Sequence, residues 1–164
     1  MPEKVSPPRA ATFEDVKRLV AKLNEAGVDY LLIGGYALFA HGYHRATEDI
    51  DLLVPMTAET GRKLRQALLA LPEKAAEEID PAWFEEPDNI RVAGDFVIDI
   101  LFNAAGETWR TLSSHAETVD FDGVPARTVN LEGLLRTKQT LREKDAADRA
   151  ILERALEAIR RSNP

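Results

Sequence analysis

The sequence has no cysteine among its 164 residues. Disulfides, thiolate metal ligands and a cysteine nucleophile are therefore excluded, and nothing in the composition argues for an oxidising compartment. The uninterrupted apolar runs are about half a dozen residues long, far short of the ~20 residues that a membrane-spanning helix needs. The first ten residues contain three prolines and no apolar signal core. The sequence therefore predicts a cytoplasmic protein that does not enter a membrane.

Positive charge is scarce as well, with 21 Lys and Arg against 28 Asp and Glu and a formal net charge of -7. This balance disfavours attraction to nucleic acid, so we expect no non-specific DNA binding. The hydrophobic share of 45% is ordinary for a globular protein, and the length suits one domain. We expect a single domain over residues 1–164, with a loose arm over residues 1–11 and a C-terminal helical segment over residues 131–162 that packs on the core.

The spacing of apolar residues predicts alternating helices and strands. Thr12, with Glu14 and Asp15 after it, is typical of a helix start, and Gly27 is typical of a helix end. One helix is therefore expected between Thr12 and Gly27. Further helices are expected over residues 36–41, 58–71, 109–113, 131–142 and 145–161. The expected strands lie over residues 30–33, 50–54, 89–93 and 96–102, with a further hairpin about Asp122–Gly123. The fold class is therefore α/β or α+β, with a short mixed sheet flanked by helices.

One aspartate lies where a charge is unexpected. Asp99 interrupts an apolar run, residues 96–102, that would otherwise fill both faces of a covered strand. An ionised carboxylate that is buried without a partner costs several kcal/mol or shifts its pKa, so Asp99 needs a cation. A salt bridge at the strand end or a bound metal ion would each supply one.

Two more aspartates, Asp49 and Asp51, stand at the start of the strand predicted over residues 50–54. Their spacing points both side chains to one face of the strand, where like charges roughly 6.5 Å apart repel each other. Alone, the pair also fits a solvated strand start. Together with Asp99, the pair suits Mg²⁺ or Mn²⁺ rather than zinc, and could hold two ions ~3.5 to 4 Å apart, as in phosphoryl transfer.

Two further features could bind phosphate. Gly34 and Gly35 lie between a predicted strand and a predicted helix, where backbone N–H groups can hold a phosphate, although a glycine pair also fits a plain tight turn. Lys138 falls on the apolar face of the helix predicted over residues 131–142, and either extends to the rim or binds phosphate. Asp148, on a buried face of the last helix, would fix the direction of a nearby cation.

These segments resemble a known family. The glycine turn at Gly34–Gly35, the Asp49–Asp51 pair after thirteen intervening residues and the isolated Asp99 resemble the nucleotidyltransferase superfamily of the DNA polymerase β type. Within it, residues 34–54 are most similar to the small bacterial proteins grouped with the AbiEii-type toxin nucleotidyltransferases. Residues 134–148 are similar to that group's two closing helices.

The resemblance implies transfer of a nucleoside monophosphate from an NTP to a protein, RNA or small-molecule acceptor, with a cognate toxin or antitoxin protein as a further partner. It implies that Asp49 and Asp51 bind two catalytic Mg²⁺ or Mn²⁺ ions. Asp99 would ligate the ion beside the acceptor and take the acceptor's proton.

The resemblance also implies where the NTP binds. The family's turn is commonly Gly-Ser, so with Gly35 at the second position the phosphate contacts at Gly34, Gly35 and Tyr36 would come from backbone N–H groups. Arg45 precedes the aspartate strand and would contact phosphate or acceptor, or form a structural salt bridge. Lys138 would be a phosphate ligand.

Two other functions stay open. One is a non-catalytic nucleotide-binding or interaction module that retains the fold, which Gly35 in place of serine favours. The three aspartates argue against it, because without metal their repulsion would destabilise the fold. The other is an antibiotic adenylyltransferase, but such enzymes usually add a larger helical domain, and only 34 residues follow Asn130.

Overall fold

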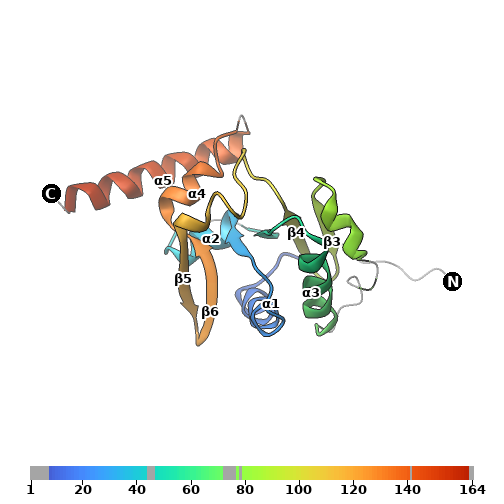
Figure 1. Cartoon of the computed structure of the whole chain (residues 1–164). Coiled ribbons are helices and arrows are strands. Elements are labelled where there is room, and N and C mark those ends of the chain that lie inside the picture. Colours follow the sequence, from blue (N-terminus) through green and yellow to red (C-terminus); the bar gives the residue numbers. More distant parts are fainter. Residues whose placement is uncertain (1–7, 44–46, 72–76, 78, 141, 163–164) are drawn as a thin grey trace.

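The computed structural model describes residues 8–43, 47–71, 77, 79–140 and 142–162. A six-stranded mixed sheet forms its centre, and helices lie on both sides of it (Figure 1). The strands are β1 (Leu31–Ile33), β2 (Ile50–Leu53), β3 (Ile90–Ala93), β4 (Val97–Leu101), β5 (Ala116–Phe121) and β6 (Val124–Val129). The α-helices are α1 (Phe13–Glu25), α2 (Gly34–Ala40), α3 (Ala58–Leu69), α4 (Leu131–Arg136) and α5 (Glu143–Ser162). The predicted fold class, a mixed sheet flanked by helices, is confirmed.

The sheet has the strand order β3-β4-β2-β1-β6-β5. β2 runs parallel to β4 and antiparallel to β1, and β3 and β4 form the predicted antiparallel hairpin. The parallel register sets Asp51 directly beside Asp99. The pairing of β2 with β4 therefore brings together the two aspartate motifs, which lie about 50 residues apart in the sequence.

Alternation along the strands divides the core into two parts. Ile50 and Leu52 of β2 and Ile98 of β4 belong to the larger apolar cluster, which includes residues of α1 and α3. Leu53 belongs to a smaller cluster with residues of α2, α4 and α5. Because side chains alternate between the faces of a strand, Asp51 shares the face of Leu53, toward the C-terminal helices.

The helix start at Thr12 is confirmed as a capping box, in which Thr12 accepts from the Asp15 backbone N–H and Asp15 accepts from the Thr12 N–H. Arg9 also donates two hydrogen bonds to the Asp15 carboxylate, and its backbone N–H donates to Asp95. Residues 1–7 of the arm lie outside the described residues, but the expectation of a loose segment is wrong for residues 9–11. They are tied to the body because Asp15, buried with 4% of its surface exposed, needs the Arg9 cation.

This contact predicts acid sensitivity. Hydrogen bonds from Arg9 lower the pKa of Asp15 from 3.8 to about 2, against the opposing effect of burial. Stability from this group is present above pH 3.8 and is lost as the pH falls through about 2, because the unfolded chain binds the proton first. We expect a loss of about 1 to 2 kcal/mol, reduced by the solvent exposure of Arg9. Urea unfolding near neutral pH and near pH 2 measures it in the wild type and in Asp15→Asn.

The exposed Asp122 gives a matched control, since Asp122→Asn should keep the acid dependence of the wild type. An equal loss of stability on acidification in the wild type and in Asp15→Asn would contradict the prediction.

Two predicted helices differ in the structure. The helix expected over residues 131–142 ends at Arg136, where the hydroxyl of Thr137 donates to the carbonyl of Leu134. The sequence predicted a longer helix because Lys138 has the spacing of a residue on the buried face of that helix. Lys138 is indeed buried, but by its contacts with α5 rather than as part of α4. The helix expected over residues 109–113 is a turn, followed by a short 3₁₀ helix at Ser113–His115.

The last helix, α5, extends beyond β5 and β6 at one end of the molecule (Figure 1). None of the helices in the described ranges has both the length and the apolar character that a bilayer crossing would need.

Candidate active site

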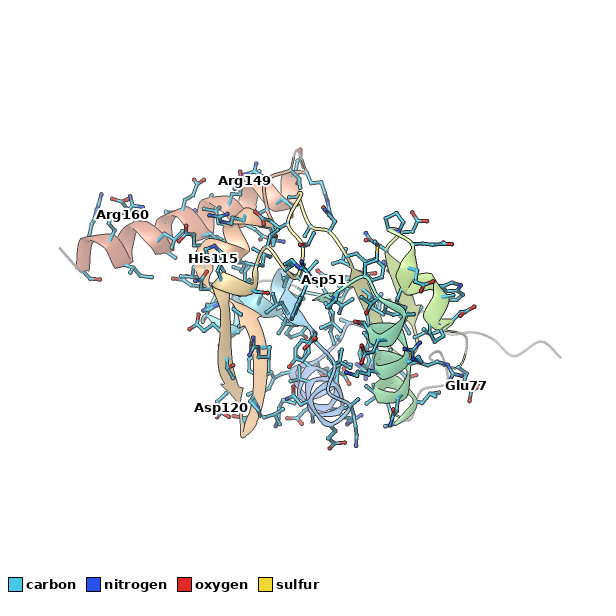
Figure 2. The ribbon with its side chains drawn as sticks, in the orientation of Figure 1. Asp51, Glu77, His115, Asp120, Arg149 and Arg160 are labelled. Carbon is cyan, nitrogen blue, oxygen red and sulfur yellow. The ribbon has the colours of Figure 1, made fainter. Side chains whose placement is uncertain are left out.

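The three predicted aspartates line one cavity of about 540 Å³ on the sheet face toward the C-terminal helices. Figure 2 shows Asp51 near the centre of the molecule, between those helices and α1. Among the described residues, five carboxylates and three cationic side chains line the cavity. The lining residues are Gly35, Thr47, Glu48, Asp49, Asp51, Asn89, Arg91, Asp99, Leu101, Lys138, Arg142 and Asp145.

The aspartates interact with one another across two strands. Asp51 and Asp99 are direct neighbours in the β2–β4 register, and Asp49 precedes β2. Their side chains are partly buried, with 24% of Asp99 and 32% of Asp49 exposed. Burial raises the pKa of Asp99; Arg91 opposes this rise, whereas the charge of Asp49 adds to it. A carboxylate with a raised pKa is a better proton acceptor once ionised, since its conjugate acid is weaker.

A fourth residue, Arg91, supplies positive charge to this group. Its Nη1 lies 3.5 Å from Oδ1 of Asp99 and 3.6 Å from Oδ2 of Asp49. It lies on β3 directly opposite Asp99 in the hairpin register. The salt bridge that the sequence left open for Asp99 is therefore present, within the same cluster as the other two aspartates.

The glycine turn presses against the aspartate strand. Gly34 has a φ of +72°, and a Cβ built on it would lie 2.3 Å from Oδ2 of Asp51. A Cβ on Gly35 would lie 2.2 Å from Oγ1 of Thr47. The turn therefore needs glycine at both positions, at the first for its backbone conformation as well. The serine common in the resembled family does not fit beside Thr47 in this arrangement.

On the C-terminal side, Lys138 is buried between two carboxylates. Its Nζ lies 3.3 Å from Asp145 and 3.1 Å from Asp148, and these side chains are 9%, 7% and 1% exposed respectively. Burial alone would raise the pKa of Asp145, but the Thr140 hydroxyl and the Lys138 ammonium hold it below its ordinary value. The expectation that Asp148 fixes the direction of a cation is confirmed.

The segment that carries Lys138 is held by α5. Arg149 donates from Nη1 to the backbone carbonyls of Lys138 and Thr140. Arg142 is 70% exposed, lines the cavity and lies 3.9 Å from Asp145. The start of α5 thus positions one buried and one exposed cation beside the aspartates.

The donor chemistry of the site fits a hard divalent cation, but the side chains are not arranged as a ready-made cage. Carboxylate oxygens are the ligands that Mg²⁺ and Mn²⁺ prefer. As the side chains stand, the described residues include no group of three or more His, Cys, Asp or Glu that could hold a metal ion. The Arg91 guanidinium, paired with Asp49 and Asp99, shows that the site already accommodates positive charge.

Three other residues, Tyr36, Arg45 and Lys138, were predicted to contact the nucleotide. Tyr36 is buried in the main apolar cluster, where its hydroxyl donates to the carbonyl of Ala11, so its side chain is structural. Arg45 lies outside the described residues. Lys138 lines the cavity but is held by carboxylates, and its predicted phosphate contact stays a prediction.

The sequence reasoning missed Arg91, Asn89 and Arg149. Arg91 could have been found from the hairpin, because a turn centred on Asp95 pairs residue 91 with residue 99. Asn89 precedes the same strand and carried no pattern of its own. Arg149 acts through backbone carbonyls, which no local sequence signal marks.

Comparison with known proteins gives a likeness in structure alone. No family model matches the chain, and no curated protein matches its sequence. Among solved structures, the chain is similar to an antigenic nucleotidyltransferase-like protein from Paracoccidioides brasiliensis, with a TM-score of 0.53 and 16% sequence identity. The match covers 90% of this chain and 78% of that chain. The chain therefore has a nucleotidyltransferase-like fold.

Proposed function

We propose that this chain is a nucleotidyltransferase that uses two Mg²⁺ or Mn²⁺ ions to transfer a nucleoside monophosphate from an NTP to a protein, RNA or small-molecule acceptor. One observation carries the proposal. Asp51 and Asp99 on two neighbouring parallel strands, and Asp49 just before the first of them, line a single cavity together with Lys138 and Arg142. A cavity of about 540 Å³ is in the range of small-molecule sites.

The charges of the lining support a metal-dependent reaction. A triphosphate would be repelled by the five carboxylates of the cavity unless divalent cations neutralised them. Asp49, Asp51 and Asp99 would hold the ions, which when bound would polarise the triphosphate and lower the pKa of the acceptor hydroxyl. On this proposal the same cavity would hold the metal ions at the aspartates and the triphosphate at Lys138 and Arg142.

The chain's own groups then account for the transfer. The acceptor oxygen forms a bond to the α-phosphorus, the bond from that phosphorus to the bridging oxygen breaks, and pyrophosphate leaves with that electron pair. Asp99 takes the acceptor's proton, a role that the burial of its carboxyl group favours. Lys138 and Arg142 would bind the triphosphate oxygens and orient the α-phosphorus.

The double variant Asp49→Asn/Asp51→Asn tests this function. We expect it to lose at least about 100-fold in transfer rate, because an amide neither carries the charge nor binds the ions as a carboxylate does. The assay incubates the chain with each labelled NTP, Mg²⁺ and either tRNA or cell lysate as the acceptor source. Chelation by EDTA should abolish transfer, and Asp122→Asn, on a distant turn, should not affect it. Label transfer that survives the double substitution would refute the proposal.

The narrower AbiEii-like assignment, with a cognate toxin or antitoxin, is also a proposal. It is supported by the sequence motifs of residues 34–54 and 134–148. It predicts that induced expression arrests growth, and that a protein encoded beside this chain relieves the arrest. Growth that is unaffected by either gene would count against it.

A second function is favoured by the Arg91 ion pairs. Because Arg91 supplies positive charge to Asp49 and Asp99, the aspartates need no metal for the fold to be stable. A non-catalytic nucleotide-binding module would therefore also keep this arrangement. Thermal stabilisation by NTP and Mg²⁺ without any transfer would favour this module over the enzyme.

A further inference from the structure

Arg91 contacts two of the three carboxylates that are proposed to bind metal. Its guanidinium pairs with carboxylates that reach it from two different places, Asp49 before β2 and Asp99 on β4. In the absence of metal it is a cation that reduces the repulsion between these two carboxylates. A divalent cation bound to these carboxylates would meet this positive charge at close range, so the ion and the guanidinium would compete for the same groups.

The contact is easy to break. Arg91 is 62% exposed, and both ion-pair distances, 3.5 and 3.6 Å, lie in the outer part of the range for a salt bridge. Exposed pairs of this kind contribute about 1 kcal/mol or less each.

A second place is available to the side chain. Arg91 also lines a smaller hollow of about 290 Å³ that includes Trp83, Glu86 and Asp88. Trp83 is 43% exposed, and an indole face and two carboxylates attract a guanidinium. Arg91 thus lies between two acidic surroundings, one at the aspartates and one at this hollow.

We propose that Arg91 is a positioning residue that holds Asp49 and Asp99 in the absence of metal and is displaced toward the Trp83 hollow when a divalent cation binds. The inference rests on the proposed function. Arg91 sets the metal concentration at which the site fills, because each ion must first displace the guanidinium. It does not touch the reacting atoms.

Mn²⁺ binding to the full chain without nucleotide tests this role, measured by calorimetry and by the electron paramagnetic resonance of free Mn²⁺. Arg91→Gln should bind Mn²⁺ about 5- to 10-fold more tightly than the wild type, because the competing charge is gone. Arg91→Lys should lie between them, since an ammonium bridges two carboxylates less well than a guanidinium. Arg154→Gln, which removes an equal charge from the exposed face of α5, should change affinity by less than about twofold.

Asp51→Asn separates the two ideas, because it changes a proposed metal ligand and leaves in place Asp49 and Asp99, the two carboxylates that Arg91 is proposed to hold. If Mn²⁺ binds, is lost in Asp51→Asn and is no tighter in Arg91→Gln than in Arg154→Gln, the role of Arg91 is overturned and the proposed function stands. If no variant shows binding that depends on Asp51, the metal-dependent function fails, and the role of Arg91 fails with it. Tighter binding in Arg91→Gln alone supports both.

Discussion

Replacing Lys138 by methionine is expected to lower the free energy of unfolding by about 3 to 5 kcal/mol. Methionine fills a similar volume but removes the ammonium that lies 3.1 Å from Asp148 and 3.3 Å from Asp145. Two buried carboxylates would then repel each other in a poorly solvated place. Urea unfolding followed by circular dichroism measures the loss.

Lys63→Met is the matched control. Lys63 forms an exposed pair with Glu59 on α3 at 3.3 Å, so its loss should cost less than about 1 kcal/mol. The triple variant Lys138→Met/Asp145→Asn/Asp148→Asn should regain part of the stability, because all three charges of this buried group are then removed together. If Lys138→Met costs no more than Lys63→Met, Lys138 does not neutralise a buried pair.

Replacing Gly34 by alanine is expected to lower the transfer rate at least about 100-fold, because the new Cβ would displace the carboxylate of Asp51. The Asp51 Oδ2, Cγ and Cβ atoms lie 2.3, 3.1 and 3.2 Å from the position of that Cβ. The Asp51 carboxylate can rotate away from the new Cβ, so the cost in stability is modest. The rotated carboxylate would no longer lie where the proposed metal ion needs it, so the loss of activity is large. Steady-state transfer assays and Mn²⁺ titration both report the displacement.

Gly27→Ala separates this effect from backbone strain. Gly27 has a nearly equal φ of +69°, but a Cβ there meets nothing within 4 Å. Both variants should lose about 1 to 2 kcal/mol of stability, because alanine is disfavoured at positive φ. Only Gly34→Ala should lose activity and metal affinity. Equal activity in the two variants would show that contact with Asp51 does not matter.

Local signals predicted much of the fold. Thr12 caps the helix that was predicted to start there, and the strands at 50–53, 90–93 and 97–101 lie within their predicted ranges. These elements depend on neighbouring residues, which a local pattern contains. The early end of α4 was missed because it depends on α5, whose Arg149 binds the carbonyls beyond it.

The site was predicted in part for the same reason. The need of Asp99 for a cation follows from its apolar neighbours, and its meeting with Asp51 follows once their strands pair. The sequence did not contain the strand order, which sets β4 beside β2. The opposition of Arg91 to Asp99 was missed although the hairpin between β3 and β4 determines it. The Tyr36 side chain is buried in the main apolar cluster, but its predicted phosphate contact is through the backbone N–H and stays a prediction.

The parallel pairing of β2 with β4 aligns Asp51 with Asp99 whatever the number of residues between the two strands in the sequence. α3 and β3 lie in the chain between these strands, outside their shared ladder. Related chains can therefore gain or lose residues in that connection and still keep Asp51 level with Asp99. One residue inserted inside β4 before Asp99 would instead turn its carboxylate toward α1 and α3. Evolutionary drift in length should thus concentrate between the two motifs and spare the strands themselves.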